Sequence, residues 1–381
     1  MLNLSVAVDA RCLNVPNMRG MGKYVHEMIS HMPNDRDIQW IFLSDRPDLP
    51  FHFPLVRNNK TFINDCRGYR FHVWEQLMLP LIARRQQAHV LHCAATTLPV
   101  WQPLPTVVTV HDTLYWTERL QGTDEKHKSI YWDNVVPRAL SKANAIITIS
   151  QRSLRDILAL WPCLEGKVTV IPHGVSDRYL ESKRQVLGPQ GRDLLEGTRY
   201  ILYVGGALER KRFRWALEVV REVRKKEPGV VLAACGFSKE EVDAATDSVP
   251  FELRNAVKIL AFVSEEQMPA LYCGASVVLY PTLYEGFGLP VIESLATGTP
   301  ILFSALGSLE ELQGPGAVVL PPFELQPWVD AVCRALGSED SREMRQTDGR
   351  IWASGYSWAH SSKKHLDVYI AARNSVAVRR A

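Results

Sequence analysis

The chain has 381 residues, of which 46% are hydrophobic and 22% charged, and its formal net charge is +3. This composition excludes a disordered or collagen-like chain, and so small a net charge gives no indication of a nucleic-acid partner. The length is sufficient for two domains of ordinary size, each with its own core.

The first predicted element is a buried parallel strand at Leu4–Asp9, because its residues are almost all apolar. A glycine-rich stretch, Gly20-Met21-Gly22, follows it and leads into a predicted helix. A glycine turn between a strand and a helix brings ligand and backbone close together at the carboxyl edge of a parallel sheet. A plain tight turn is the alternative, because two glycines alone carry little specificity.

Further short apolar runs predict strands at 38–43, 61–63, 89–93 and 106–110. The segment 71–84 has large apolar side chains at helical spacing, which predicts an amphipathic helix. The side chains expected in its core are Trp74, Leu77, Met78 and Leu81. Pro80 predicts a kink or a break within this helix.

His111 and Asp112 directly follow the strand at 106–110. Open parallel sheets bind ligands at the carboxyl ends of their strands, so this position favours a site role for His111. A structural histidine bonded to a backbone carbonyl is the alternative. Asp112 could orient His111, contact an acceptor or cap the next segment.

A polar, glycine-containing segment at 177–199 is the best candidate for a linker. The strand after it, at 200–204, ends in Gly205 and Gly206, and Arg210 and Lys211 come shortly afterwards. A cationic pair at such a strand–turn–helix corner would neutralise a diphosphate, and arginine can bind two oxygens at once. A solvated basic turn is the alternative.

The stretch from Glu285 to Glu293, EGFGLPVIE, lies between an apolar strand at 275–280 and a predicted helix at 291–297 that Gly298 closes. Its two glycines let a ligand approach the backbone, and the free N–H groups of the helix start favour an anion. The two carboxylates can accept hydrogen bonds from sugar or ribose hydroxyls. Two solvated glutamates on an ordinary corner are the alternative.

The Glu-x7-Glu spacing around GFGLP, with Thr282-Leu283-Tyr284 before it and Ala296-Thr297-Gly298-Thr299-Pro300 after it, resembles the donor-site motif of the retaining glycosyltransferases of family 4. The resemblance covers essentially the whole chain and is strongest over 200–311. It implies an α/β fold of the GT-B type, with two Rossmann-like doubly wound domains and a cleft between them.

The resemblance also implies roles for single residues. Arg210 and Lys211 would bind the donor diphosphate, Glu285 a sugar hydroxyl and Glu293 the ribose hydroxyls, while His111 would lie near the donor sugar. The other residues implied at the donor are Gly20, Gly22, Gly205, Gly206, Gly286, Phe287, Gly288 and Leu289. Those implied at the acceptor are Asp112, Ser150 and Arg152, although Ser150 is also a plausible helix N-cap. The residues expected to carry catalysis are His111, Glu285, Lys211 and Arg210.

This chain departs from the family pattern at four positions: Gly206 replaces an early arginine, Arg212 an asparagine, His173 a commoner asparagine and Glu310 a frequent proline. The expected domains are an acceptor-side domain at 1–178, a linker at 179–199 and a nucleotide-sugar-binding domain at 200–355. A terminal helix at 356–381 is expected to return to the first domain, as it does in relatives.

The expected reaction is transfer of a hexose from a nucleotide diphosphate sugar, without a metal cofactor. The segment Trp74-Glu75-Gln76 resembles mannosyl- and related hexosyltransferases of surface polysaccharide assembly, which favours GDP-mannose as donor and a saccharide or lipid-linked saccharide as acceptor. The Asp-x-Asp at 35–37 lies in a polar turn and is not expected to bind metal. Two alternatives remain: a nucleotide-sugar epimerase of the same fold, and a non-catalytic nucleotide-sugar-binding protein.

Seven scattered cysteines without a C-x-x-C pair indicate reduced core residues in a cytoplasmic protein, not a disulfide framework or a zinc site. The N-terminus lacks a charged region before its short apolar segment, so no signal peptide is expected. No apolar run approaches the roughly 20 residues of a membrane-spanning helix. The surplus of positive charge lies in the first half of the chain, where it favours a solvated face or peripheral contact with an acidic membrane.

Overall fold

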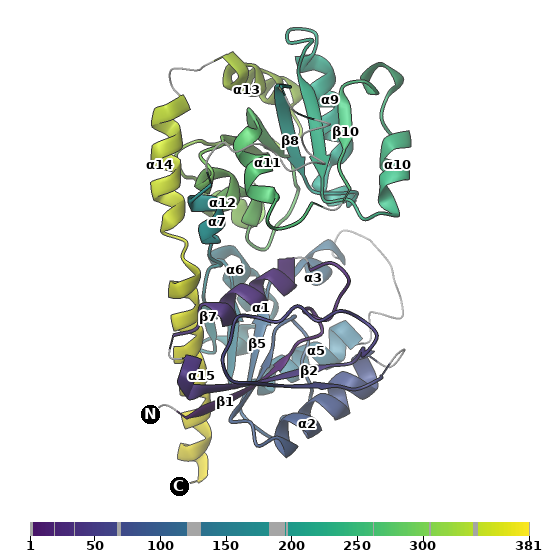
Figure 1. The fold of residues 1–381 in the computed structure, drawn as a ribbon. Helices are drawn as coiled ribbons and strands as arrows, with labels where there is room; N and C mark the ends of the chain where they lie inside the picture. Colours follow the sequence, from purple (N-terminus) through teal and green to yellow (C-terminus); the bar gives the residue numbers. More distant parts are fainter. Residues whose placement is uncertain are drawn as a thin grey trace. The chain divides into compact units, whose positions relative to one another are not determined.

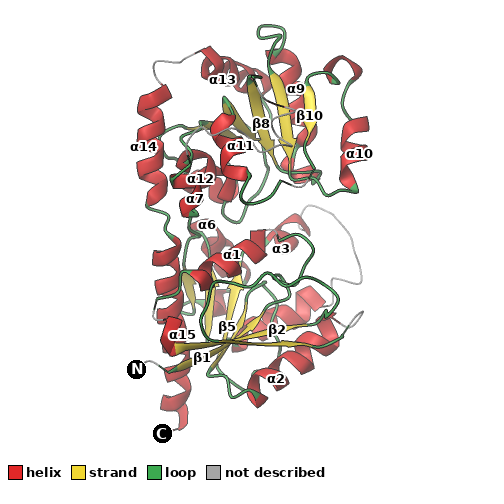
Figure 2. Cartoon of the chain, in the orientation of Figure 1, coloured by secondary structure: helices red, strands yellow, loops and turns green. Residues whose placement is uncertain are grey.

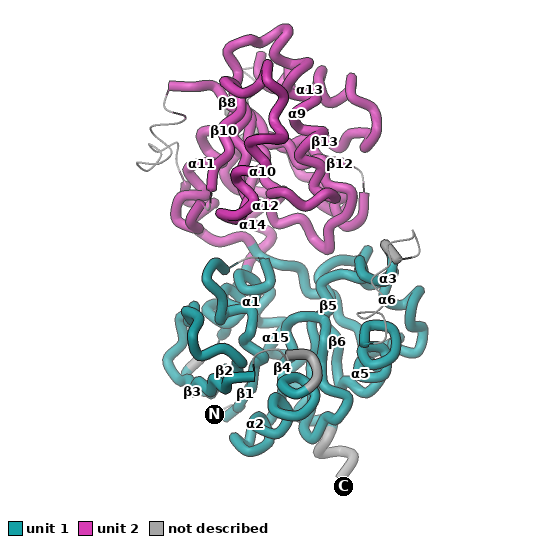
Figure 3. The backbone as a smooth tube through the Cα atoms, turned by 90° about the vertical axis from the view of Figure 1, so that its right-hand side faces the viewer, with its two compact units in different colours: residues 1–174, 358–381 teal, residues 175–357 magenta. Residues whose placement is uncertain are grey.

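The computed structural model describes residues 3–18, 20–33, 35–66, 70–119, 131–182, 195, 197–261, 263–304, 306–337 and 342–380. The chain divides into two compact units (Figure 3). Unit 1 comprises Met1–Gly174 with Trp358–Ala381, and unit 2 comprises Val175–Ser357. Each unit alternates strands and helices around a parallel sheet of its own (Figure 2).

Unit 1 contains a seven-stranded sheet in the order β3-β2-β1-β4-β5-β6-β7, with every neighbouring pair parallel. Its strands are β1 (Leu4–Asp9), β2 (Ile38–Ser44), β3 (Asn59–Ile63), β4 (Val90–Cys93), β5 (Thr106–Val110), β6 (Ala145–Thr148) and β7 (Val168–Val170). Alternate residues of β1 belong to different cores: Val6 and Val8 to one cluster, Ala7 to another. The sheet is therefore buried on both faces, as its apolar strands predict.

The helices of unit 1 surround this sheet. They are α1 (Gly20–Ser30), the π-helix η2 (Arg70–Met78), α2 (Leu79–Arg85), α3 (Leu114–Arg119), the π-helix η3 (Tyr131–Val135), α5 (Val136–Lys142), α6 (Gln151–Leu160) and α15 (Trp358–Arg380), with 3-10 turns η1 (Asp35–Asp37) and η4 (Pro162–Leu164). The last helix, α15, packs against α1, β4 and β5 (Figure 1). Its Trp358 and Tyr369 are buried in the core of unit 1.

The segment 71–84 differs from its predicted amphipathic α-helix. It is a π-helix, η2, followed by α2, which has Pro80 in its first turn. Trp74 is fully buried, but Leu77 is 54% exposed, so the prediction that Leu77 lies in the core is wrong. A π-helix has a longer period than 3.6 residues, and the spacing argument therefore fails here. Glu75, the neighbour of Trp74, is buried instead.

Unit 2 contains a six-stranded parallel sheet in the order β10-β9-β8-β11-β12-β13. Its strands are β8 (Tyr200–Val204), β9 (Val231–Cys235), β10 (Val257–Ile259), β11 (Val277–Tyr280), β12 (Ile301–Ser304) and β13 (Ala317–Leu320). Its helices are α7 (Asp177–Leu180), α9 (Phe213–Val223), α10 (Glu241–Asp247), α11 (Met268–Gly274), α12 (Leu289–Ala296), α13 (Leu325–Gly337) and α14 (Arg342–Ser354), with 3-10 turns η5 (Glu209–Lys211), η6 (Phe251–Leu253) and η7 (Gly307–Glu311). Residues 183–194 and 196 of the predicted linker lie outside the described residues.

Both sheets have one point where the chain reverses the direction in which it adds strands. In unit 1 this switch point lies between β1 and β4, and in unit 2 between β8 and β11. Loops from the carboxyl ends of two adjacent strands diverge at such a point, and open α/β sheets bind their ligands there. Each unit therefore has one place where a site is expected from topology alone.

Candidate active site

The loop after β8 is shaped by two glycines, Gly205 and Gly206. Gly206 has φ +66°, and a Cβ at this position would overlap the carbonyl group of Gly236, which follows the neighbouring strand β9. A Cβ at Gly205 would overlap the hydroxyl group of Tyr203. The loop therefore lies directly against its neighbours, and only glycine allows this close approach.

Arg210 and Lys211, on η5, meet the carboxylate of Glu285, which follows β11. Arg210 Nη1 donates to Glu285 Oε1 at 3.0 Å, and Lys211 Nζ donates to the same oxygen. Thr282 Oγ1 donates to that oxygen at 2.7 Å, and Lys211 also donates to the hydroxyl oxygen of Tyr280 at 2.9 Å. The switch point of the unit 2 sheet thus brings together three of the four predicted catalytic residues.

The charges of this cluster follow from its contacts. Burial acts to raise the pKa of Glu285, but Lys211 and then Arg210 outweigh it, so the pKa of this carboxyl lies below its usual value. Burial lowers the pKa of Lys211, and Glu285 opposes that shift. Two cations and one carboxylate leave a net charge of +1. The Arg210 side chain is 27% exposed, so an anion can reach it from solvent.

The loop from Gly286 to Gly288 connects this cluster to α12. Gly288 has φ +108° and precedes the first residue of the helix, Leu289. The Ser308 hydroxyl bonds to the carbonyl oxygens of Glu285 at 2.6 Å and Phe287 at 3.0 Å, which fixes the loop. The Phe287 side chain is buried with its ring 5.9 Å from that of Tyr356. Because its side chain is used for packing, any contact of Phe287 with a donor would come from its backbone, and that role stays a prediction.

Glu293 lies one turn into α12 and is buried. Its Oε2 accepts a hydrogen bond from the Tyr272 hydroxyl at 3.1 Å. Burial, with Glu293 adding to it, raises the pKa of Tyr272 well above its usual value, so this hydroxyl remains a donor. A ribose hydroxyl would have to reach the carboxylate beside Tyr272, and the role of Glu293 in ribose binding stays a prediction.

In unit 1, Gly20 and Gly22 open α1. A Cβ at Gly22 would overlap the carbonyl oxygen of Cys12, whereas the space around Gly20 is open. Two residues further on, the ring of Tyr24 lies edge-on to the ring of His111, with 5.0 Å between centroids. The predicted Gly20–Gly22 turn and His111 therefore belong to one region of unit 1.

His111 follows β5, and its ring is buried. Its Nε2 donates to the carbonyl oxygen of Ala94 at 2.8 Å, because a carbonyl can only accept. Burial lowers the pKa of His111, which favours the neutral ring and leaves Nδ1 as an acceptor. Asp112 Oδ1 accepts from the Leu114 N–H at 3.0 Å, which agrees with the capping alternative, while a contact with the acceptor stays a prediction.

Ser150 and Arg152 make local contacts on α6. Ser150 Oγ accepts from the Ser153 N–H at 3.0 Å, which confirms the predicted N-cap. Arg152 Nε lies 3.0 Å from Asp156 Oδ1, one turn along the same helix. These contacts explain both residues structurally, and their roles at an acceptor stay predictions.

Sequence reasoning missed two parts of the molecule. In unit 2 it did not assign Tyr280 and Thr282 to the ion-pair cluster, although both immediately precede the Glu285 motif. In unit 1 it missed a buried cluster of Asp9, Arg11 and Glu75 at the switch point of the sheet. Two signals were available: Asp9 and Arg11 at the end of the apolar strand β1, and the segment Trp74-Glu75-Gln76, which had been noted for its resemblance alone.

Two family models match the chain. The one described as "Glycosyl transferases group 1" matches residues 189–352, and the one described as "Glycosyltransferase Family 4" matches residues 18–179. The chain belongs to these glycosyltransferases. In this glycosyltransferase, the group 1 match lies on unit 2 and contains its switch point. The family 4 match lies largely on unit 1 and contains the residues around its switch point other than β1 and Arg11.

The glycosyltransferase is 25% identical over 371 residues to the O-antigen chain mannosyltransferase B of Escherichia coli, covering 92% of this chain and 96% of the relative. It is 25% identical over 243 residues to the D-inositol 3-phosphate glycosyltransferase of Nocardia farcinica, covering 61% of this chain and 54% of the relative.

Among solved structures, the glycosyltransferase is similar to the sucrose-phosphate synthase of Thermosynechococcus elongatus, with TM-score 0.71, 18% identity and coverage of 98% and 100% of the two chains. It is also similar to HepE of Anabaena in complex with UDP and glucose, with TM-score 0.71, 15% identity and coverage of 96% and 99%. The fold is GT-B, as predicted.

Among the residues that the structure describes, no helix combines the length and the apolar content that crossing a membrane requires. Nor do those residues contain a group of three or more His, Cys, Asp or Glu side chains placed to hold a metal ion. None of the seven cysteines, all of which are described, forms a disulfide bond.

Proposed function

We propose that this glycosyltransferase transfers a hexose, with mannose favoured, from a nucleotide diphosphate sugar to a saccharide or lipid-linked saccharide acceptor during surface polysaccharide synthesis. The anomeric configuration is retained. The observation that carries the proposal is the meeting of Arg210 and Lys211 with Glu285 at the switch point of unit 2. A site with net charge +1, partly open to solvent, suits the diphosphate of such a donor.

The chemistry requires stabilisation of the leaving diphosphate. As the bond between the anomeric carbon and the diphosphate oxygen breaks, negative charge builds up on that oxygen. Arg210 and Lys211 are held in place by Glu285, so they stabilise this charge without much reorganisation. The acceptor hydroxyl oxygen forms the new bond on the same face of the sugar, and its proton passes to the departing diphosphate. No covalent enzyme intermediate is required.

The remaining residues would position the two substrates. Glu285, ionised by its cationic neighbours, accepts hydrogen bonds from sugar hydroxyls, and Glu293 accepts from the ribose. The amides of Gly286–Gly288 add donors toward the phosphates. In unit 1, the neutral His111 ring offers Nδ1 as an acceptor, and the Gly20–Gly22 turn lies in the same region.

The relatives support mannose as the transferred sugar. The match along nearly the whole length of both chains is to an O-antigen chain mannosyltransferase, and a second relative, from Salmonella typhimurium, carries the same description with 23% identity over 225 residues. The HepE structures are complexes with UDP and with UDP-glucose instead. UDP-glucose is therefore the comparison donor in any assay.

We propose that the reaction needs no metal ion, because Arg210 and Lys211 already supply the positive charge that the leaving group requires. Addition of EDTA should then leave the rate unchanged. A loss of activity that Mg²⁺ or Mn²⁺ restores would contradict this part of the proposal.

The test is a donor panel of GDP-mannose, UDP-glucose and other nucleotide sugars, assayed with the full chain for nucleoside diphosphate release with and without saccharide and lipid-linked acceptors. GDP-mannose should give the highest kcat/KM, and NMR should show an α-linked product. A free nucleotide sugar isomer formed without acceptor would favour the epimerase alternative, and donor binding without turnover would favour the binding protein. Lys211→Ala should lose turnover with every donor that the wild-type protein uses.

A further inference from the structure

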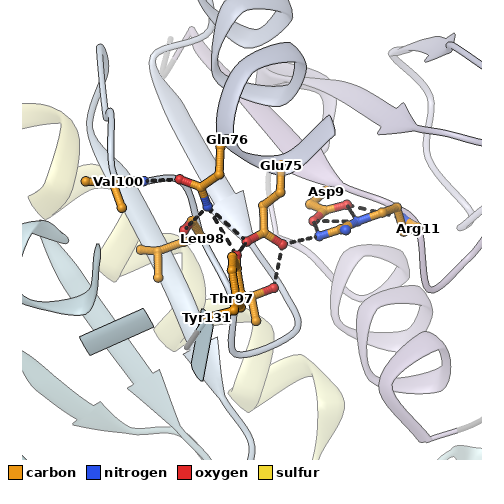
Figure 4. Close-up of polar contacts among 8 residues, drawn as sticks. All are labelled: Asp9, Arg11, Glu75, Gln76, Thr97, Leu98, Val100 and Tyr131. Carbon is orange, nitrogen blue, oxygen red and sulfur yellow. Dashed lines mark hydrogen bonds and ion pairs between the residues drawn. The ribbon is translucent and has the colours of Figure 1, made fainter. Parts of the chain in front are cut away.

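A second charged cluster lies at the switch point of the unit 1 sheet (Figure 4). Asp9 is the last residue of β1, and Arg11 follows two residues later. Thr97 belongs to the connection after β4, the strand adjacent to β1. Glu75 projects from the π-helix η2 into the space between them (Figure 4).

Glu75 is the centre of this cluster. Arg11 Nη2 donates to its Oε2 at 2.7 Å, and Thr97 Oγ1 donates to the same oxygen at 2.6 Å. Its Oε1 accepts from the Tyr131 hydroxyl and from Gln76 Nε2, the latter at 3.3 Å. Both carboxylate oxygens are therefore occupied by donors from four different residues.

The cluster is closed to solvent, unlike the one in unit 2. The side chains of Glu75, Asp9 and Arg11 are 0%, 3% and 9% exposed. Burial opposes the charge of Arg11, but Asp9 and Glu75 together hold its pKa well above the usual value. Burial and Glu75 raise the pKa of Tyr131, so its hydroxyl is a donor at neutral pH. These groups bond to one another and are closed to solvent, so we look for their role in the loops that they hold in place.

On one side, the cluster supports the Gly20–Gly22 turn. Arg11 is fixed by Glu75 and by side-chain bonds to Asp9, from Nε at 2.9 Å and 3.1 Å and from Nη2 at 2.6 Å. The next residue, Cys12, presents the carbonyl oxygen against which Gly22 packs so closely that no Cβ would fit. The position of the Arg11–Cys12 backbone therefore determines where α1 and its glycine turn begin.

On the other side, the cluster supports His111. The connection after β4 is held by the bond from Thr97 to Glu75 and by the Thr96 N–H, which donates to the Thr109 carbonyl at 2.8 Å. The same connection begins with Ala94, whose carbonyl oxygen accepts from His111 Nε2. The carboxylate of Glu75 thus joins the two parts of unit 1 that are predicted to contact the sugar.

We propose that Glu75 is a positioning residue for the transfer reaction, holding the Gly20–Gly22 turn through Arg11 and His111 through Thr97. The inference rests on glycosyl transfer as proposed above, but not on the identity of the sugar. Stability alone does not explain a buried ionic group, because apolar side chains of similar volume are often as stabilising or more so. Directional bonds to four donors fix one arrangement of the loops, which apolar packing does less strictly.

The test compares Glu75→Gln with Leu164→Ala, measured on the full chain. Glu75→Gln keeps the shape of the side chain and leaves Arg11 paired with Asp9, so no buried charge is stranded. Leu164 is a buried core residue of η4 in the same unit and has no part in the cluster. Both variants should lower Tm, but only Glu75→Gln should lower kcat per active site, by about tenfold to a hundredfold, since small displacements of positioning groups have effects of this size.

Two further measurements separate positioning from general damage. The Kd for the nucleoside diphosphate should stay within about twofold of wild type in Glu75→Gln, because that ligand is assigned to unit 2. Hydrogen exchange should rise at residues 12–22 and 94–97 in Glu75→Gln and stay near wild type in Leu164→Ala. Exchange unchanged in these two segments, or a kcat no lower than that of Leu164→Ala, would overturn the inference.

A wild-type protein that neither binds a nucleoside diphosphate nor turns over any nucleotide sugar would instead refute the proposed function, while the exchange experiment would still report on Glu75. If Glu75→Gln does not fold, Tyr131→Phe removes one donor to the same carboxylate and keeps the ring. Its kcat should then fall with the nucleotide Kd unchanged, and equal kcat values in Tyr131→Phe and wild type would refute the inference.

Discussion

The two sheets of this glycosyltransferase have the same kind of switch point but opposite electrostatics. In unit 2, Arg210 and Lys211 face one carboxylate, and the side chains are 27%, 13% and, for Glu285, 12% exposed. In unit 1, Arg11 faces two carboxylates, Asp9 and Glu75, and all three are less than 10% exposed. The unit 2 corner, formed by Arg210, Lys211 and Glu285, carries net charge +1 and reaches solvent. The unit 1 corner, formed by Asp9, Arg11 and Glu75, carries −1 and is closed.

This difference separates binding from positioning. A charged group can bind a ligand from solvent only where the ligand can reach it, and the ligand binds more tightly where its charge is opposite to the net charge of the site. The unit 2 corner meets this condition. In unit 1 the two buried carboxylates share one cation, so removal of Arg11 leaves Asp9 and Glu75 buried without it. Removal of a cation should therefore have its larger effect on stability in unit 1 and its larger effect on catalysis in unit 2.

The largest expected effect is on the stability of unit 1. Arg11→Met leaves Asp9 and Glu75 buried without their cation, which should lower the free energy of unfolding by about 3–5 kcal/mol. Arg210→Met removes a partly exposed partner while Lys211 still neutralises Glu285, so its cost should be about 0–1 kcal/mol. Urea unfolding of the two variants gives the comparison directly. If the two variants lose the same free energy of unfolding, the lower exposure of the unit 1 corner does not make its ion pairs more important for stability.

The reverse comparison concerns catalysis. Lys211→Ala removes one of the two cations that stabilise the leaving diphosphate and should lower kcat by about 10²–10³-fold, or about 3–4 kcal/mol. Lys225→Ala is the matched control, because Lys225 is an exposed lysine paired with Glu222 in the same unit. Steady-state kinetics with the best donor provides the measurement. A fall in kcat of less than about threefold in Lys211→Ala would show that the diphosphate does not bind at Lys211.

How far the sequence predicts these two corners depends on how local their signals are. Arg210, Lys211 and Glu285 were predicted because each lies near a glycine-rich turn that follows an apolar strand and because these segments resemble the donor site of family 4. Glu75 could not be found in this way. Its partner Arg11 lies 64 positions away, and the π-helix that carries it breaks the 3.6-residue period on which the core prediction for 71–84 relied.

Unit 1 also contains a chain of buried hydrogen bonds that joins His365 to His92 through Tyr24 and Thr109. His365 Nδ1 must donate to the Ser361 carbonyl at 2.8 Å, so in the neutral ring Nε2 accepts from the Tyr24 hydroxyl at 2.8 Å. The Tyr24 oxygen then accepts from Thr109 Oγ1, also at 2.8 Å, which in turn accepts from His92 Nε2 at 2.9 Å. A second proton on His365 would point at the Tyr24 hydroxyl and reverse this order.

His365 of unit 1 should contribute to the pH dependence of stability. Burial lowers the pKa of His365 from 6.5 to about 4. Between these values the unfolded chain binds a proton that the folded chain does not, so the free energy of unfolding falls as pH falls from 6.5, by about 3 kcal/mol at pH 4 from this residue alone. Above pH 6.5 His365 should contribute no slope. Thermal unfolding of His365→Gln against pH should show a shallower fall than wild type, and an unchanged slope would assign the dependence to other groups.

The smallest expected effect concerns Arg212, which continues the basic run of the unit 2 corner but faces elsewhere. Its φ of +57° places it in the left-handed region, and its guanidinium carbon lies 4.1 Å from the Trp215 ring centroid and 5.3 Å from that of Phe323. It also donates to the Pro322 carbonyl. We expect Arg212→Ala to lower the free energy of unfolding by about 1 kcal/mol and to leave the donor KM within about twofold.

This variant therefore tests which of the three consecutive basic residues, 210 to 212, face the donor. Arg210 and Lys211 turn toward Glu285, whereas the left-handed residue after them turns its side chain toward two aromatic rings. If donor KM rises about tenfold in Arg212→Ala while unfolding is unchanged, the guanidinium leaves the rings when the diphosphate binds. The open corner would then carry three cations toward the donor, and its contrast with the closed corner of unit 1 would be greater than the contacts described above indicate.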